Sequence, residues 1–138
     1  MPLIKIRGNF VADQFTAVNH TKESRELTEN ITADKTLDAA DSGKLFYVTV
    51  DAKTITLPAT ALGLTYTIVN GLPAGQTIVT ISPNASDKIS GADLTAADNK
   101  DLINTKATAR YGDKVVLFAD GADGWFIQKM TGTWARQA

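Results

Sequence analysis

Residues 111–127 have the sequence YGDKVVLFADGADGWFI. Two apolar runs, residues 115–118 and residues 125–127, lie on either side of a loop, residues 120–124, that contains only Asp, Gly and Ala. Asp and Gly tolerate the left-handed backbone conformations that tight turns need. Short apolar runs separated by such residues are typical of β-strands joined by turns. The segment therefore predicts a β-hairpin near the end of the sequence.

The same pattern extends from residue 36 to residue 134. Further apolar runs occupy residues 45–48, 55–57, 66–69 and 78–81, with turn residues such as Asp41-Ser42-Gly43 and Asn70-Gly71 between them. Weaker strands are expected around Ile89, residues 102–103 and residues 105–110, and residues 92–98 are the one helix candidate. We expect an all-β fold of eight to ten strands, an antiparallel β-sandwich or jelly-roll-like domain with an N-terminal extended arm.

The runs also predict pairing and burial. The strand at residues 65–70 ends at Asn70-Gly71, and residues 76–81 are expected to be its partner strand. Phe46, Ile68, Val116 and Phe118 are expected in the core. Trp125 is expected in the core as well, whereas the sequence leaves the role of Trp134 open.

Residues 1–35 differ from the body at residues 36–138. They carry scattered apolar residues without a period of 2 or 3.6, followed by a charged run at residues 22–26. Two interpretations stay open: an arm that is ordered by a partner, or additional edge strands of the same domain. In the first case the contact residues to the partner or to a neighbouring subunit are Leu3, Ile4, Ile6, Phe10, Phe15 and Val18.

Composition restricts the class of function. The net charge is −1, and Lys and Arg are balanced by Asp and Glu both before and after residue 35. A nucleic-acid-binding protein usually carries a basic patch, so we expect no nucleic-acid partner. No stretch approaches the roughly 20 apolar residues of a membrane span, and the first residues lack the apolar core of a signal peptide. We therefore expect synthesis in the cytoplasm and no membrane association.

Candidate catalytic and metal-binding residues are few. His20 is the only histidine and cysteine is absent, which removes the usual transition-metal and nucleophilic constellations. Residues 98–101 and 120–124 could offer oxygen ligands to calcium, but neither loop has the pattern of an EF-hand, and turn chemistry explains both. We expect no catalytic residue, no metal, no cofactor and no enzymatic activity. A small hydrolase stays a third interpretation, because a carboxylate pair leaves no spacing signature.

Several motifs resemble a β-rich module of tailed-phage virion proteins. They include residues 37–44 (LDAADSGK), a strand ending in Leu-Pro at residues 55–58, a tyrosine-bearing strand at residues 66–70, a Gly-Asp turn at Gly112-Asp113 and a Gly-Trp strand at Gly124-Trp125. The resemblance covers residues 36–134. It is a resemblance to the head decoration (cement) proteins of tailed phages, and similar modules occur in tail fibres.

The resemblance implies a structural virion protein. We expect a capsid decoration protein that is located on the phage head surface, binds the major capsid protein, stabilises contacts between capsomers and forms a homo-oligomer, namely a trimer. The short sequence and the arm-like N-terminal segment favour the head. The alternative is a receptor- or glycan-binding module of a phage tail fibre, with the polar loops of residues 84–104 as its contact surface.

Overall fold

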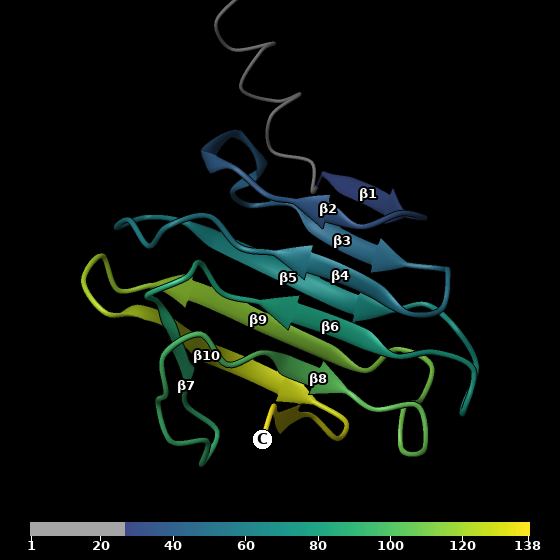
Figure 1. Cartoon of the computed structure of the whole chain (residues 1–138). Helices are drawn as coiled ribbons and strands as arrows, with labels where there is room; N and C mark the ends of the chain where they lie inside the picture. The colour runs from purple at the N-terminus through teal and green to yellow at the C-terminus, as the bar shows by residue number, and fades with distance from the viewer. Residues whose placement is uncertain (1–26) are drawn as a thin grey trace, which may run out of the picture.

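The computed structural model describes residues 27–138, which form two β-sheets lying face to face (Figure 1). In order across the six-stranded sheet, the strands are β1 (Thr28–Ile31), β3 (Leu45–Val48), β5 (Thr65–Asn70), β9 (Lys114–Ala119), β10 (Gly124–Thr131) and β7 (Lys88–Ser90). In the five-stranded sheet they are β11 (Ala135–Arg136), β8 (Leu102–Asn104), β6 (Val79–Ser82), β4 (Lys53–Thr56) and β2 (Lys35–Thr36). Among the described residues the only helical segment is a 3₁₀ turn, η1 (Ala39–Asp41). The expectation of an all-β fold is confirmed.

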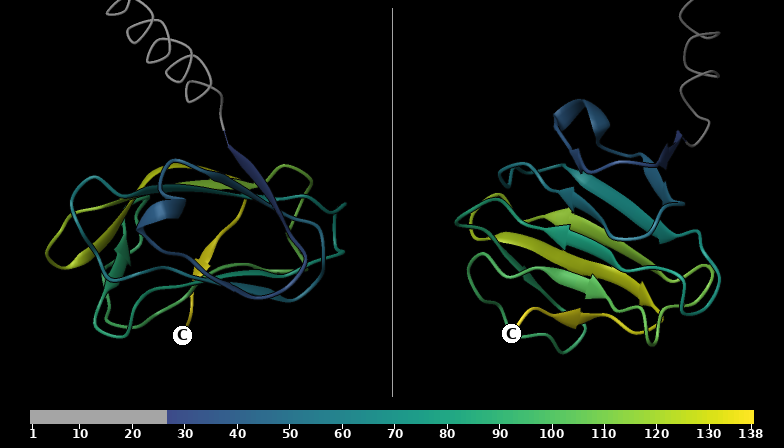
Figure 2. Two further views of the ribbon diagram at one scale, coloured as in Figure 1. Left: turned by 90° about the horizontal axis from the view of Figure 1, so that it is seen from above. Right: turned by 45° about the vertical axis from the view of Figure 1, so that its right-hand side comes forward.

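Over the first six strands the chain passes alternately from one sheet to the other. Odd-numbered strands β1, β3 and β5 are neighbours in one sheet, even-numbered strands β2, β4 and β6 are neighbours in the other, and all these neighbours are parallel. A parallel pair needs a crossover connection that returns the chain to its starting end. Here the crossover is a strand of the opposite sheet. Seen from above, the chain runs around the two layers (Figure 2).

The later strands pair differently. β9 is antiparallel to both β5 and β10, and β8 is antiparallel to both β6 and β11, whereas β7 runs parallel to β10. The hairpin of β9 and β10, predicted around residues 120–124, is confirmed. The expectation of antiparallel pairing throughout is wrong, because both sheets are mixed.

The predicted pairing of residues 65–70 with residues 76–81 is also wrong. β6 lies in the opposite sheet from β5 and pairs with β4 and β8. Neither Asn70 nor Gly71 has a positive φ angle, so the pair does not form a tight hairpin turn. A Cβ on Gly71 would lie 2.5 Å from Tyr47 Cε2. This glycine is therefore required by close packing against Tyr47, and the following residues carry the chain across to the other sheet.

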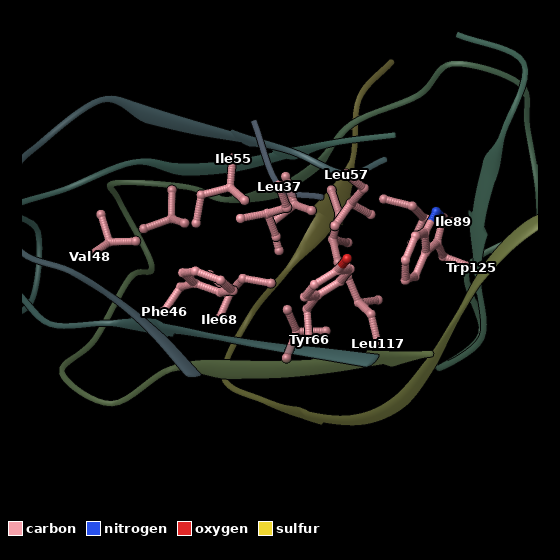
Figure 3. Packing of buried hydrophobic residues seen from close by; sticks show 14 of the residues in the cluster. Leu37, Phe46, Val48, Ile55, Leu57, Tyr66, Ile68, Ile89, Leu117 and Trp125 are labelled. Carbon is pink, nitrogen blue, oxygen red and sulfur yellow. The ribbon is translucent and has the colours of Figure 1, made fainter. Parts of the chain in front are cut away.

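One apolar core fills the space between the sheets. The six-stranded sheet contributes Phe46, Tyr66 and Ile68 to this core. They face Ile55 of β4 and Leu57, which comes directly after β4. All five side chains are fully buried (Figure 3). Full burial of a large apolar side chain is worth about 1.5–3 kcal/mol. The expected burial of Phe46 and Ile68 is confirmed.

Aromatic side chains extend this core toward β10. The Tyr66 ring lies 6.2 Å from the Phe46 ring and 5.4 Å from the Trp125 ring, between centroids. The Tyr66 hydroxyl donates a hydrogen bond to the Asp38 carbonyl at 2.6 Å. Burial, together with nearby carboxylates, raises the pKa of Tyr66 to about 12. Trp125 is 1% exposed, as expected.

The expected burial of Val116 and Phe118 is wrong. In β9 the buried residues are Val115, Leu117 and Ala119, whereas Val116 is half-buried and Phe118 is 40% exposed. Side chains alternate between the faces of a strand, so a shift of one residue exchanges the whole set. Both faces of residues 115–118 are apolar, and that run alone does not say which face is the inner one.

Buried polar side chains connect the sheets at one end of the strands. Asn70 Nδ2 in β5 donates to Asn104 Oδ1 in β8 at 2.9 Å. Asn104 Nδ2 in turn donates to Asp113 Oδ2 and to the Thr133 carbonyl, each at 2.9 Å. Asp113 Oδ2 also accepts the Arg110 backbone N–H. Because buried polar groups are costly when unpaired, this network fixes the relative position of the two sheets.

The polar region between β6 and β9 follows its predictions in part. Strands β7 and β8 form at Ile89 and at residues 102–104, as expected. Residues 105–110 form a turn instead of a strand, in which the Ala109 N–H donates to the Thr105 carbonyl at 2.8 Å. Residues 92–98 do not form a helix.

The structure describes the last part of the N-terminal segment, residues 27–35 of residues 1–35. β1 is an edge strand paired with β3, and its last residue, Ile31, belongs to the core. Lys35 starts β2. Of the segment up to residue 35, residues 1–26 lie outside the part that the structure describes.

Candidate interaction surface

The side of the six-stranded sheet that points away from the core carries apolar side chains in register. Phe118 of β9 pairs with Phe126 of β10. One row along, Leu45 of β3 pairs with Thr67 of β5, which pairs with Val116 of β9. We name this side the outer face; its apolar and threonine residues are Leu45, Tyr47, Thr65, Thr67, Val69, Val116, Phe118 and Phe126, and Lys114 and Lys129 lie on the same side.

Phe118 and Phe126 are the most exposed members of the outer face. Their ring centroids are 5.7 Å apart with an interplanar angle of 21°, so the rings are stacked. Phe118 is 40% exposed and Phe126 is 41% exposed. Stacking shields part of each ring from water, but large apolar area stays accessible. Exposed apolar groups gathered on one surface commonly mark sites of protein–protein interaction or ligand binding.

Two tyrosines lie near the opposite end of the outer face. Tyr47 is half-buried, and its hydroxyl is 3.4 Å from the Gly71 carbonyl oxygen. Burial and the neighbouring Tyr111 raise the pKa of Tyr47 above its ordinary value. Tyr111 itself is exposed. The outer face thus has an aromatic group toward each end, with Thr, Val and Lys side chains between them.

A second surface lies at the edges of the two sheets that are formed by β1 and β2. In the described residues, β1 and β2 each have a neighbouring strand on one side only, and both free edges lie at the same end (Figure 1). Between them, residues 29–35 line an open hollow of about 230 Å³. Leu27, just before β1, is exposed. Free edges are surfaces to which another strand can add.

Ion pairs connect these edge strands to η1. Lys35 of β2 pairs with Glu29 of β1, and Lys44 Nζ lies 2.8 Å from Asp41 Oδ1. Burial alone would raise the pKa of Asp41, but the Lys44 hydrogen bond, the Asp38 backbone N–H and the charge of Lys35 outweigh it and hold the pKa below its ordinary value. Charged side chains at an edge discourage unspecific strand addition.

The predicted contact residues Leu3, Ile4, Ile6, Phe10, Phe15 and Val18 lie outside the described residues, as does His20. The interpretation of residues 120–124 as a turn is confirmed. Asp120 Oδ1 accepts the backbone N–H groups of Ala122, Asp123 and Gly124 at 2.7–2.9 Å. These hydrogen bonds hold the pKa of Asp120 below its ordinary value. Trp134, whose role was open, is buried and donates to the Thr131 carbonyl.

Sequence reasoning missed the stacked phenylalanines, although the signal was present. A hairpin turn at residues 120–124 places Phe118 opposite Phe126 and Ala119 opposite Trp125. If Trp125 faces the core, alternation puts Phe126 on the outer face, and Phe118 follows its pair partner. The hairpin and the tryptophan together therefore decide which side of β9 faces outward.

Comparisons with known proteins return no match: no protein-family model matches the sequence, and no curated protein is significantly similar to it. Among residues 27–138, no helix has the length and hydropathy to cross a membrane.

Proposed function

We propose that this protein is a structural protein of a tailed-phage particle. It decorates the outside of the head, binds the major capsid protein and stabilises contacts between capsomers. The observation that carries the proposal is the outer face of the six-stranded sheet, with Phe118 and Phe126 stacked and exposed on it. The motif resemblance of residues 36–134 supports the assignment to a phage head.

The energetics suit a contact that is repeated over a lattice. Full burial of a Phe side chain is worth about 1.5–3 kcal/mol, so covering the remaining exposed part of each ring is worth roughly 1 kcal/mol. A face of this kind gives a modest affinity per site. A ligand that binds only the assembled lattice stabilises that lattice by mass action, and the effect is repeated at every occupied position.

The edge strands β1 and β2, together with the N-terminal arm, complete the proposed contact. The two sheets form the body, and the N-terminal arm predicted from the sequence reaches a neighbouring subunit. The free edges of β1 and β2 accept a strand across the subunit boundary. A trimer places three such bodies around a three-fold position of the head, on the virion surface.

A second candidate is a receptor- or glycan-binding module of a tail fibre. The observation that favours it is a small hollow beside Phe126, lined partly by the polar segment that follows β7. The two candidates differ in partner and in location in the particle.

Co-sedimentation with undecorated heads tests the head assignment. We expect the wild-type protein to bind heads saturably, and we expect the Phe118→Asp variant to lose at least about tenfold in affinity, because a carboxylate then has to be desolvated in the contact. Val50→Asp is the matched control. Val50 is 37% exposed, similar to Phe118, but it follows β3 and is not part of the outer face.

Equal binding of Phe118→Asp and wild type would exclude the outer face as the contact. Absence of saturable binding by the wild-type protein, together with binding to intact tails, would favour the tail-fibre candidate instead.

Deletion of residues 1–20 tests the arm. We expect the circular dichroism spectrum to remain that of a β-protein, since β1 begins at Thr28, while co-sedimentation with heads is lost. Loss of the folded spectrum would place the segment in the core, and undiminished binding would show that the body alone makes the contact.

A further inference from the structure

A small hollow lies at the end of the outer face, where β7 pairs with β10. Its volume is about 110 Å³, and its wall includes Lys88, Ser90, Ala96, Asp120, Asp123 and Phe126. These residues come from three separate parts of the sequence: β7, the segment after β7, and the β9–β10 turn with the start of β10. The fold therefore brings them together, and no single motif does.

One wall of the hollow is an exposed aromatic ring. Phe126 pairs with Ser90 on one side and with Phe118 on the other. Phe118 is not part of the wall, so the two stacked rings are not equivalent. An aromatic ring that is anchored on one side and open on the other is a platform for a flat ligand with apolar C–H groups.

The remaining wall offers both donors and acceptors. The carboxylate of Asp123 and the hydroxyl of Ser90 have no hydrogen-bond partner within residues 27–138. Lys88 Nζ lies 3.7 Å from Asp98 Oδ1, and the Asp98 side chain is 70% exposed. Such an exposed pair is weak, so the ammonium group can donate to a ligand.

The wall is held in place before any ligand arrives. Three backbone N–H groups fix Asp120, and the Thr60 hydroxyl donates to the Gly124 carbonyl at 2.6 Å. A Cβ on Gly124 would lie 2.2 Å from the Lys88 carbonyl oxygen, and its φ is +150°. Only glycine lets β7 approach β10 this closely. A wall that is already ordered spares the ligand an entropic cost.

The combination of groups selects the class of ligand. Asp120 and Asp123 repel an anionic ligand, and the apolar Phe126 ring favours a ligand with an apolar face over a small inorganic cation. A hydroxyl group can donate to a carboxylate and accept from an ammonium group. We propose that this hollow binds one sugar ring of a neutral saccharide, with a C–H face on Phe126 and hydroxyls on Asp123, Asp120 and Lys88. This proposal rests on the second candidate function given above, and the site shares Phe126 with the outer face, so a bound sugar and a head contact compete for that ring.

Titration of the ¹⁵N-labelled full-length protein, followed by ¹H–¹⁵N NMR, tests the proposal. The probes are the methyl glycosides of glucose, galactose and mannose, and N-acetylglucosamine, each up to about 50 mM. For a single sugar ring in a shallow hollow we expect a Kd on the order of 1–10 mM. At least one probe should give saturable shifts at the amides of Ser90 and Phe126.

Three variants make the assignment specific. Phe126→Ala should weaken binding at least about tenfold, whereas Val50→Ala, at an exposed apolar residue outside the hollow, should leave the Kd within about twofold. Asp123→Asn should weaken binding several-fold, and the spectrum of each variant also reports whether the fold is retained. The proposal is overturned if no probe gives saturable shifts, if the shifts centre elsewhere, or if Val50→Ala weakens binding as much as Phe126→Ala. No capsid enters this experiment, so its failure leaves the head contact unaffected.

Discussion

The two faces of the six-stranded sheet are both rich in aromatic and branched side chains, yet their surroundings differ. The inner face carries Phe46, Tyr66 and Trp125, all at most 1% exposed beneath the five-stranded sheet. The outer face carries Phe118 and Phe126, each about two-fifths exposed. Similar side chains on one sheet thus hold the fold together on one side, and on the other side they are available to a partner.

The first test of this comparison makes the same substitution on both faces. Phe46→Ala should cost about 3–5 kcal/mol of the free energy of unfolding, because it leaves a cavity in a closely packed core. Phe118→Ala should cost only about 1–2 kcal/mol, since its ring is partly covered and stacks on Phe126. Urea denaturation monitored by tryptophan fluorescence measures both values.

Comparable losses for the two variants would show that the outer face is covered in solution and belongs to the core. A near-neutral Phe46→Ala would contradict the packing of the inner face.

The second test concerns the polar network that joins the sheets. Asn104→Ala should cost about 1–3 kcal/mol, because Asn70 and Asp113 each lose a buried hydrogen-bond partner. Asn30→Ala is the matched control. Asn30 is an exposed asparagine in β1 that accepts from the Thr49 hydroxyl, and its loss should cost less than about 0.5 kcal/mol. If both variants unfold at the same urea concentration, the network does not contribute to the stability of the fold.

The smallest expected effect is the pH dependence from Asp120. Its folded-state pKa lies below the unfolded value of 3.8. The carboxylate therefore contributes stability above about pH 4, and this contribution is lost as the pH falls through the folded pKa. Thermal melts from pH 7 down to pH 2 should show a smaller decrease in Tm below pH 4 for Asp120→Asn than for wild type. Parallel curves for the two proteins would show that the turn does not respond to this charge.

The sequence predicts the strands better than their connections. Residues 45–48 and 65–70 appear as strands because turn residues bound short runs that are rich in apolar residues. The alternation of parallel strands between the two sheets has no comparable signal in the sequence. It depends on the chain crossing to the opposite layer after Asn70-Gly71, where Gly71 packs closely against the Tyr47 ring, 24 residues away in sequence. Local turn chemistry contains no information about that contact.

The candidate surface shows the same limit. Residues 115–118 are apolar on both faces, so the run alone does not say which side of β9 is buried. The β9–β10 turn and the buried Trp125 together decide it, because cross-strand pairing places Phe118 beside Phe126. The hollow beside Phe126 is beyond sequence reasoning, since it requires the parallel pairing of β7 with β10.

The most direct test of the head contact is a cryo-electron microscopy reconstruction of phage heads saturated with the purified protein. We expect density for the two-sheet body at positions between capsomers, with Phe118 and Phe126 of the outer face turned toward the major capsid protein and covered by it. A reconstruction in which the body is bound but the outer face points to solvent, or in which the body is found only on tails, would contradict the account.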